Sequence, residues 1–195
     1  MTSFGLAGLL TLFGLVAFGA IIPVIPTGAL VSGAAVLAGG QMPIDVLVVV
    51  GFGAAGAYVG DLVTYAALRG AGVPLAERMG WLDSADPARA LQVIRDRLEK
   101  SEVRALLLSR LIPGGRIPVL LAAALGGYPL VRFASANVAA AILWSLAYAS
   151  IGIAGTAVFP DPKIALVVVI IGALLLSVAP EAVKRMRGRQ TADQA

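Results

Sequence analysis

Three charged residues lie inside long apolar stretches of this sequence. Asp61 lies deep in one stretch, and Arg110 and Arg116 flank a proline-glycine break in another. A charge near the centre of a bilayer costs about 2.5–3.5 kcal/mol on insertion scales, so these residues need a reason to be there. Arginine stays charged and presents a planar fork of donors that suits phosphate oxygens. The pair therefore predicts an anion site, to which the backbone N–H groups of Gly114 and Gly115 would add donors.

Asp61 has two interpretations, and the sequence leaves both open. It would form a buried ion pair with Arg110 or Arg116, or it would be a protonatable carboxylate that couples proton movement to transport. Snorkelling to the interface would explain one buried arginine more readily than two arginines that flank a turn.

Tyr65, Asn137 and Trp144 are weaker candidates for supporting this site. Tyr65 follows Asp61 by four residues and could hydrogen-bond a polar group, whereas Asn137 and Trp144 lie near the start and the middle of a later apolar stretch. Core packing is the favoured interpretation of Tyr65, and a packing or membrane-interface residue is the favoured interpretation of Trp144.

The composition excludes several kinds of chemistry. The sequence has no cysteine and no histidine, which removes disulfides, thiolate nucleophiles, the commonest general base and the commonest metal ligand. We therefore expect no metal, no cofactor and no enzyme, since the known integral lipid phosphatases rely on histidine. The net charge of +4 comes without the basic patch and stacking aromatics that nucleic-acid binding needs.

The bulk composition predicts a membrane protein. The 195 residues are 59% hydrophobic and 13% charged, and the mean hydropathy is +0.92. Soluble domains are about 45–50% apolar and about 25% charged. A single soluble core of this size could not bury so much apolar surface. We expect one membrane domain over residues 1–195.

The first predicted unit covers residues 4–42 and is interrupted in its middle. Pro23 and Pro26 break an uncharged run that is too long for one spanning helix, because proline removes a backbone donor and clashes with the preceding turn. The pattern predicts a helix over 4–22, a break, and a short helix over 30–39.

A span and a connector follow this unit. Residues 43–69 are long and apolar enough to span, and Gly56 and Gly60 on them form a small-residue face for close helix packing. Residues 70–104 are rich in charge and are expected to form an amphipathic cytoplasmic helix, either at the membrane surface or as a solvated connector. The apolar face of that helix comprises Leu91, Ile94 and Leu98.

The second half repeats this arrangement. Residues 105–128 are apolar but broken at Pro113 and Pro118, and residues 129–159 form the next span. A last span is expected over 164–180.

The distribution of positive charge predicts the topology. The basic tail over 181–195 and the connector over 70–104 should both be cytoplasmic. Both ends of 105–128 then lie on the same side of the membrane, so this segment should be a re-entrant hairpin.

The two halves would form an inverted repeat. Pro23 corresponds to Pro113, and Pro43 corresponds to Pro129. Interrupted segments at matching positions of inverted halves point to a transport site near the bilayer midplane. The predicted fold class is an all-α membrane bundle with two re-entrant hairpins.

Four segments carry a family likeness: Pro23-Val24-Ile25-Pro26, Gly56-Ala57-Tyr58-Val59-Gly60-Asp61-Leu62-Val63-Thr64-Tyr65, Ser109-Arg110-Leu111-Ile112-Pro113-Gly114-Gly115-Arg116, and Phe133 through Asn137 to Trp144. In this order they resemble the DedA family, whose shared region is called the VTT or SNARE-associated Golgi domain. The likeness covers roughly residues 15–160, and the two arginines around the proline are its most specific part.

The resemblance implies two re-entrant hairpins and movement of lipids across the bilayer. Bacterial members are implicated in returning undecaprenyl phosphate to the cytoplasmic face, some members behave as if proton-coupled, and eukaryotic relatives scramble phospholipids. The essential arginines of the family fall on Arg110 and Arg116, and its aspartate falls on Asp61. Many members also carry an acidic residue near the first proline motif, but residues 18–28 contain none.

We therefore expect a lipid translocase for an anionic head group, most readily a polyprenyl phosphate, in a bacterial plasma membrane with a cytoplasmic C-terminus. The alternatives are a proton-coupled antiporter of a small solute and a general phospholipid scramblase. A purely structural factor would leave the buried arginines unexplained. The expected partners are membrane lipids and protons, and the glycine-rich faces would permit a homodimer.

Overall fold

The computed structural model describes residues 5–22, 26–38, 43–78, 89, 96, 100–111, 115–159, 161, 164, 167–168 and 171–172. The regular elements of this part of the chain are all helices: α1 (Leu6–Ile21), α2 (Thr27–Ala38), α3 (Pro43–Arg78), α5 (Glu102–Leu111), α6 (Arg116–Leu125) and α7 (Leu130–Val158). The all-helical prediction is confirmed for these residues.

Two of these helices are long and apolar enough to cross a membrane. They are Ile44–Gly70, with 27 residues, and Leu130–Val158, with 29 residues, whereas about 20 residues suffice for a bilayer core. Both agree with the predicted spans over 43–69 and 129–159. Their side chains are apolar on the outer surface as well as in the core, as lipid contact requires.

Helix α3 is longer than the sequence analysis predicts. It continues past residue 69 to Arg78, into the stretch assigned to the connector. The start of the charged stretch ends the apolar surface but not the helix, which continues through Gly70, Gly72 and Pro74, although each glycine costs about 1 kcal/mol and an interior proline about 3 kcal/mol relative to alanine. The predicted boundary at 69 is therefore the end of the apolar span and not of the helix.

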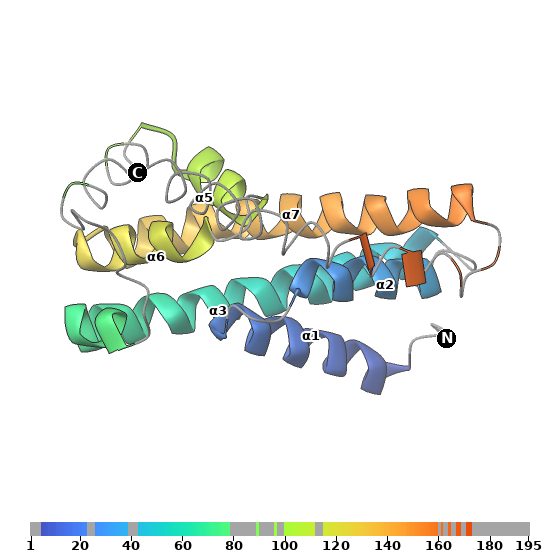
Figure 1. The fold of residues 1–195 in the computed structure, drawn as a ribbon, viewed down its shortest axis with the longest axis horizontal. Coiled ribbons are helices and arrows are strands. Elements are labelled where there is room, and N and C mark those ends of the chain that lie inside the picture. Colours follow the sequence, from blue (N-terminus) through green and yellow to red (C-terminus); the bar gives the residue numbers. More distant parts are fainter. Residues whose placement is uncertain are drawn as a thin grey trace, which may run out of the picture.

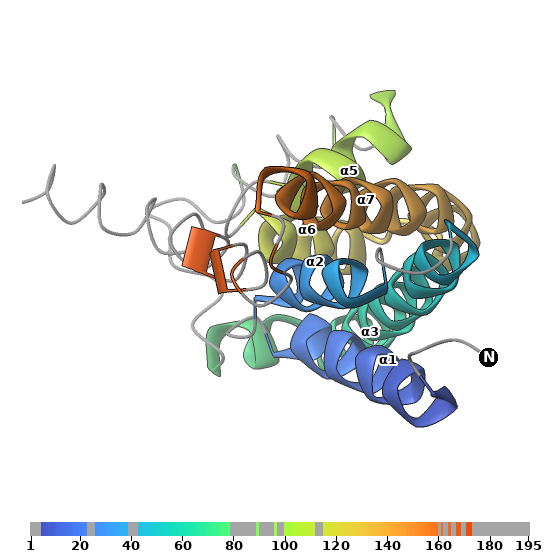
Figure 2. The same ribbon diagram turned by 90° about the vertical axis from the view of Figure 1, so that its right-hand side faces the viewer.

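The long helices α3 and α7 run antiparallel through the whole molecule, with the shorter helices packed in pairs around them (Figure 1). α1 packs along α3 and α2 along α7, towards one end, while α6 packs on α3 and α5 on α7 towards the other end. Viewed nearly along the long helices, α2 and α6 lie between α7 and α1 (Figure 2). The two pairs of short helices, α1 with α2 and α5 with α6, thus lie towards opposite ends of the same bundle.

Each helix pair has its own apolar core. One core joins α5 and α6 to the end of the apolar part of α3 and the start of α7. The other joins α1 and α2 to the first half of α3 and the second half of α7. A polar group that lies between the two cores is therefore shielded from lipid on both sides.

Glycine allows α1 to approach α3 closely. A Cβ atom added to Gly60 would lie 2.4 Å from the Cβ of Ala20 and 2.6 Å from the carbonyl oxygen of Ala17. A Cβ added to Gly56 would lie 2.6 Å from the carbonyl oxygen of Phe13. The predicted small-residue face is confirmed, and it sets α1 beside α3 in a parallel direction.

We expect Gly60→Ala to destabilise the protein by about 1–3 kcal/mol, because α1 must move to make room for the methyl group. The matched control is Gly51→Ala on the same helix, where an added Cβ meets nothing within 4 Å. This control should be neutral or slightly stabilising, since alanine is the better helix former. Thermal unfolding of the detergent-solubilised variants measures both effects, and equal midpoints would contradict the close packing of α1.

The start of α2 also differs from the prediction. The short helix begins at Thr27 rather than at residue 30, and Pro26 lies just before it. A proline at this point is compatible with a helix start, because its missing N–H would have no intrahelical partner there. The carbonyl oxygen of Pro26 instead accepts the first turn's hydrogen bond from the N–H of Ala29 at 2.9 Å.

Pro118 is a further correction. It was predicted to break the second hairpin, but it is the third residue of α6. A proline in the first helical turn removes no intrahelical hydrogen bond, so the helix forms around it. The chain is instead interrupted between α5 and α6, where Gly115 is the described residue of the connection.

Several predicted features lie outside the described residues. They are Pro23, Pro113, Gly114, the apolar face of the connector, most of the span over 164–180, and the tail over 181–195. Between residues 79 and 100 of the connector, Arg89, Asp96 and Lys100 are described, and all three are helical and exposed.

Candidate functional site

The carboxylate of Asp61 lies between the two buried arginines. Arg110 Nη2 donates to Asp61 Oδ2, and Arg116 Nε donates to Asp61 Oδ1 at 2.6 Å. Each carboxylate oxygen therefore has its own arginine. The ion pair that the sequence left as one of two interpretations of Asp61 is present, and it involves both arginines rather than one.

This group of three charges is almost wholly buried. The side chains of Asp61 and Arg110 are 2% and 4% exposed, and that of Arg116 is 17% exposed. Burying charges is tolerated only when they are paired and hydrogen-bonded. Two positive charges face one negative charge, so the cluster of Asp61, Arg110 and Arg116 retains one surplus positive charge.

Arg116 joins the site to the end of α1. Its Nη2 donates to the carbonyl oxygen of Ala20, which lies in the last turn of α1, where carbonyls lack intrahelical partners. A positive charge is also favoured at the negative end of a helix dipole. The hydroxyl of Thr64 lies 3.5 Å from the same oxygen while it donates to the carbonyl of Gly60 at 2.8 Å. The start of α6 thus touches the end of α1.

Helix α7 supplies two further partners of Arg110. Arg110 Nη2 donates to Asn137 Oδ1 at 3.2 Å, and its guanidinium carbon lies 5.7 Å from the centroid of the Trp144 ring. Asn137 and Trp144 are seven residues apart, so they share one face of the helix. An amide oxygen and a π face both attract a cation. Both residues belong to the site geometrically, including Trp144, for which packing was the favoured interpretation.

Tyr65 forms contacts beside the cluster rather than with Arg110 or Arg116. Its ring stacks on Phe133 with centroids 4.5 Å apart, and its hydroxyl donates to the carbonyl oxygen of Tyr128. Arg69 Nη1 donates to the Tyr65 hydroxyl at 2.8 Å and to the Tyr128 carbonyl at 2.9 Å. These hydrogen bonds connect the turn between α6 and α7 to α3, so Tyr65 helps to position α6.

Some members of the site have weak or no signals in the sequence. Thr64 follows Asp61 by three residues and so shares its helix face, which would have been the signal for it. Ala20 acts through its backbone carbonyl, which no side-chain pattern reveals. In the described residues there is no group of three or more side chains suited to a metal ion.

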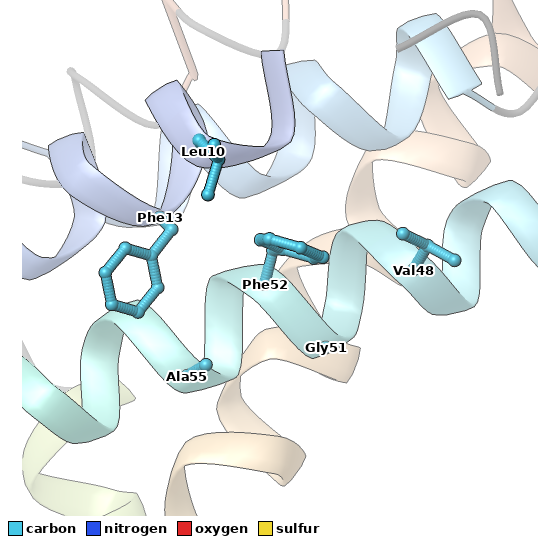
Figure 3. Close-up of a pocket in the computed structure, with 6 residues that line it drawn as sticks. All are labelled: Leu10, Phe13, Val48, Gly51, Phe52 and Ala55. Carbon is cyan, nitrogen blue, oxygen red and sulfur yellow. The ribbon is translucent and has the colours of Figure 1, made fainter. Parts of the chain in front are cut away.

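An apolar pocket of about 450 Å³ lies between α1 and α3, outside this cluster (Figure 3). It is lined by Leu10, Phe13, Val48, Gly51, Phe52 and Ala55. These side chains offer no group that could bind an anion. The pocket therefore adds nothing to the chemistry of the arginine cluster.

The residues of the site lie within a region that matches a known protein family. A family model described as the VTT domain matches residues 25–154, which is more than half of the chain and includes the three charges together with Asn137 and Trp144. Neither the comparison with curated proteins nor the one with solved structures gives a match.

Proposed function

Because this chain belongs to the VTT-domain family, also known as the DedA or SNARE-associated Golgi family, we propose that it moves a lipid with an anionic head group across its membrane. The favoured substrate class is a polyprenyl phosphate, and recycling of undecaprenyl phosphate across a bacterial plasma membrane is the corresponding role. That the chain is a membrane protein follows from the family and from its two membrane-capable helices.

One observation carries the proposal: two buried arginines share one carboxylate. The carboxylate of Asp61 accepts hydrogen bonds from Arg110 and Arg116, and the oxygens of a phosphate group could accept from the same donors. The surplus positive charge favours a further negative charge at this place. Asp61 would then compete with the head group for the arginines, and its protonation would release them.

The proposed path relies on re-entrant hairpins. We propose that α1–α2 and α5–α6 enter the membrane from opposite faces as the two halves of an inverted repeat, with the C-terminus cytoplasmic. The contact from Arg116 to the carbonyl of Ala20 supports this arrangement, because it brings the ends of the two hairpins together. Irregular backbone and charges at membrane depth are tolerated where they line a protected cavity.

The test is a transport assay in liposomes. Purified protein is reconstituted with a fluorescent short-chain polyprenyl phosphate or with an equally labelled phosphatidylcholine, with and without a pH gradient, and protein-free liposomes give the background rate. We expect the polyprenyl phosphate to cross well above background and the zwitterionic lipid to stay near it. Equal rates for both lipids would establish a general scramblase and contradict head-group selectivity.

The antiporter of a small solute is less well supported. A coupled antiporter would profit from paired carboxylates at depth, but Asp45, a further buried acid among the described side chains of α3, lies 16 residues from Asp61. At 1.5 Å per residue this is a separation of about 24 Å along the helix. Movement of neither lipid in the assay would favour this alternative over the proposed function.

A further inference from the structure

The side-chain amide of Asn137 has a donor group without a partner. Asn137 is 0% exposed, and its Nδ2 has no hydrogen-bond partner among the residues that the structure describes. Buried side-chain donors in proteins are nearly always paired, and leaving one unpaired costs about 1–3 kcal/mol. An unpaired donor beside a charged site indicates a position that a ligand completes.

The orientation of this amide follows from the chemistry of its neighbour. Asn137 Oδ1 accepts from Arg110 Nη2 at 3.2 Å. A guanidinium has donors only, so the amide must turn its oxygen to Arg110 and its NH₂ group away from it. Exchanging the two amide atoms would set two donors against each other and would not pair the nitrogen. The free donor is therefore a property of the site itself.

The unpaired Asn137 NH₂ group requires a hydrogen-bond acceptor. Helix α7 offers Arg110 two acceptor surfaces, the Asn137 oxygen and the Trp144 ring, and the amide NH₂ is left as a donor beside a surplus positive charge. A cationic group has no lone pair for such a donor, whereas each oxygen of a phosphate has. A neutral donor also adds a hydrogen bond without adding further charge to the cluster.

We propose that Asn137 is a substrate-binding residue whose Nδ2 donates to an oxygen of the phosphate group held by Arg110 and Arg116. The inference rests on the proposed function and deepens it, because it assigns the third donor and places it on a different helix. A bound phosphate would also join α7 to Arg116 on α6, whereas the contacts between α7 and the cluster among the described residues are those of Asn137 and Trp144 with Arg110 on α5.

The sequence allows a direct measurement. Asn137 is the only asparagine among the 195 residues, so protein made with asparagine labelled at the side-chain nitrogen carries one labelled amide. Cell-free synthesis avoids scrambling of the label, and membranes of phosphorus-free glycolipid leave the added probe as the only source of phosphorus. Solid-state ¹⁵N–³¹P dipolar recoupling then reports whether the phosphorus lies one hydrogen bond from Asn137 Nδ2.

Two probes distinguish the source of the phosphate. We expect strong ¹⁵N dephasing with a short polyprenyl monophosphate. Dephasing with inorganic phosphate as well would show that the head group alone suffices, and dephasing with the lipid alone would show that the tail is needed; both support the assignment. If the polyprenyl phosphate binds but the ¹⁵N signal shows no dephasing, the assignment is overturned. This is the result expected if a buried water, rather than the phosphate, accepts the hydrogen bond from Asn137 Nδ2.

Affinity measurements provide the matched variants. Asn137→Leu removes both the acceptor for Arg110 and the donor, while Asn137→Asp keeps an acceptor, loses the donor and adds a negative charge that offsets the surplus positive charge of the cluster. We expect both to weaken binding of the polyprenyl monophosphate by about ten- to hundredfold, as loss of a hydrogen bond to a charged group does. Ser145→Ala is the control, because Ser145 is a buried polar residue of α7 whose hydroxyl donates to Val50 O at 3.0 Å, and it should bind as the wild type does.

The same series separates the two levels of the argument. Wild-type affinity in both Asn137 variants, together with loss of binding in Arg116→Ala, would overturn the role of Asn137 and leave the proposed function standing. Wild-type affinity in Arg116→Ala would overturn the proposed function itself, and the role of Asn137 with it.

Discussion

Asp61→Ala is expected to lower the free energy of unfolding by about 3–5 kcal/mol, which is the usual result of leaving a buried charge without its partner. The variant leaves both arginines without their shared carboxylate, and Arg110 is only 4% exposed. The two positive charges would then repel each other in a medium that screens them weakly. Reversible unfolding in mixed detergent micelles measures the change.

Two controls identify charge imbalance as the cause. Asp45→Ala removes another buried acid of α3, one that lies in the first turn of the helix, and should cost only about 0.3–1 kcal/mol through the helix dipole. The double variant Asp61→Ala/Arg110→Met should recover much of the lost stability, because apolar residues of similar volume often replace a buried ion pair without loss. A double variant as unstable as Asp61→Ala alone would contradict this explanation.

Arg116→Ala is expected to reduce transport of a polyprenyl phosphate by about 100-fold or more, the range seen when one member of a buried charged contact is removed. The same variant should destabilise the protein much less than Asp61→Ala does, because Asp61 keeps Arg110 and the cluster becomes neutral. Both substitutions break the contact between Asp61 and Arg116, so the contrast between them separates folding from function.

Arg116→Lys tests the geometry of the donors. Arg116 uses Nε for Asp61 and Nη2 for the carbonyl of Ala20, and a single ammonium group cannot reproduce this fork. We expect it to retain the charge and the fold but to transport at a rate well below the wild type. Arg104→Ala is the matched control, since it removes an exposed arginine from α5. Wild-type transport in Arg116→Ala, measured in the same liposomes, would refute the arginine site.

The three charged residues of the site could be predicted from the sequence, whereas the choice of their partners could not. Asp61, Arg110 and Arg116 could be selected from sequence because each is a charge in an apolar segment, and that anomaly needs no knowledge of neighbours. The partners of these charges are separated from them by long stretches of chain: Asp61 from Arg116 by 55 residues and Ala20 from Arg116 by 96 residues. Those contacts depend on how the helices pack.

The local corrections have the same origin. Proline and charge predicted interruptions at Pro118 and after residue 69, but both positions are helical. Pro118 lies in the first turn of α6, where its missing N–H has no intrahelical partner, and the charged residues after 69 end the apolar surface without ending α3. Whether a helix ends at a proline or at a charged residue depends on the position of that residue within the helix and on its depth in the bundle, and neither is a property of the residue type alone.

The sequence by itself determined that the described part of the chain is helical, that it carries spans of sufficient length, and that three charges lie among apolar residues. These are consequences of composition and of short-range spacing, which act along one helix. The tertiary structure alone decided that Asp61 binds both arginines, that Arg116 reaches the end of α1, and that the Asn137 amide keeps a free donor. The close approach at Gly60 and the antiparallel packing of α3 and α7 place these groups together. Hydrogen bonds form only over a few ångströms, so contacts between residues far apart in the sequence exist only where the folded helices meet.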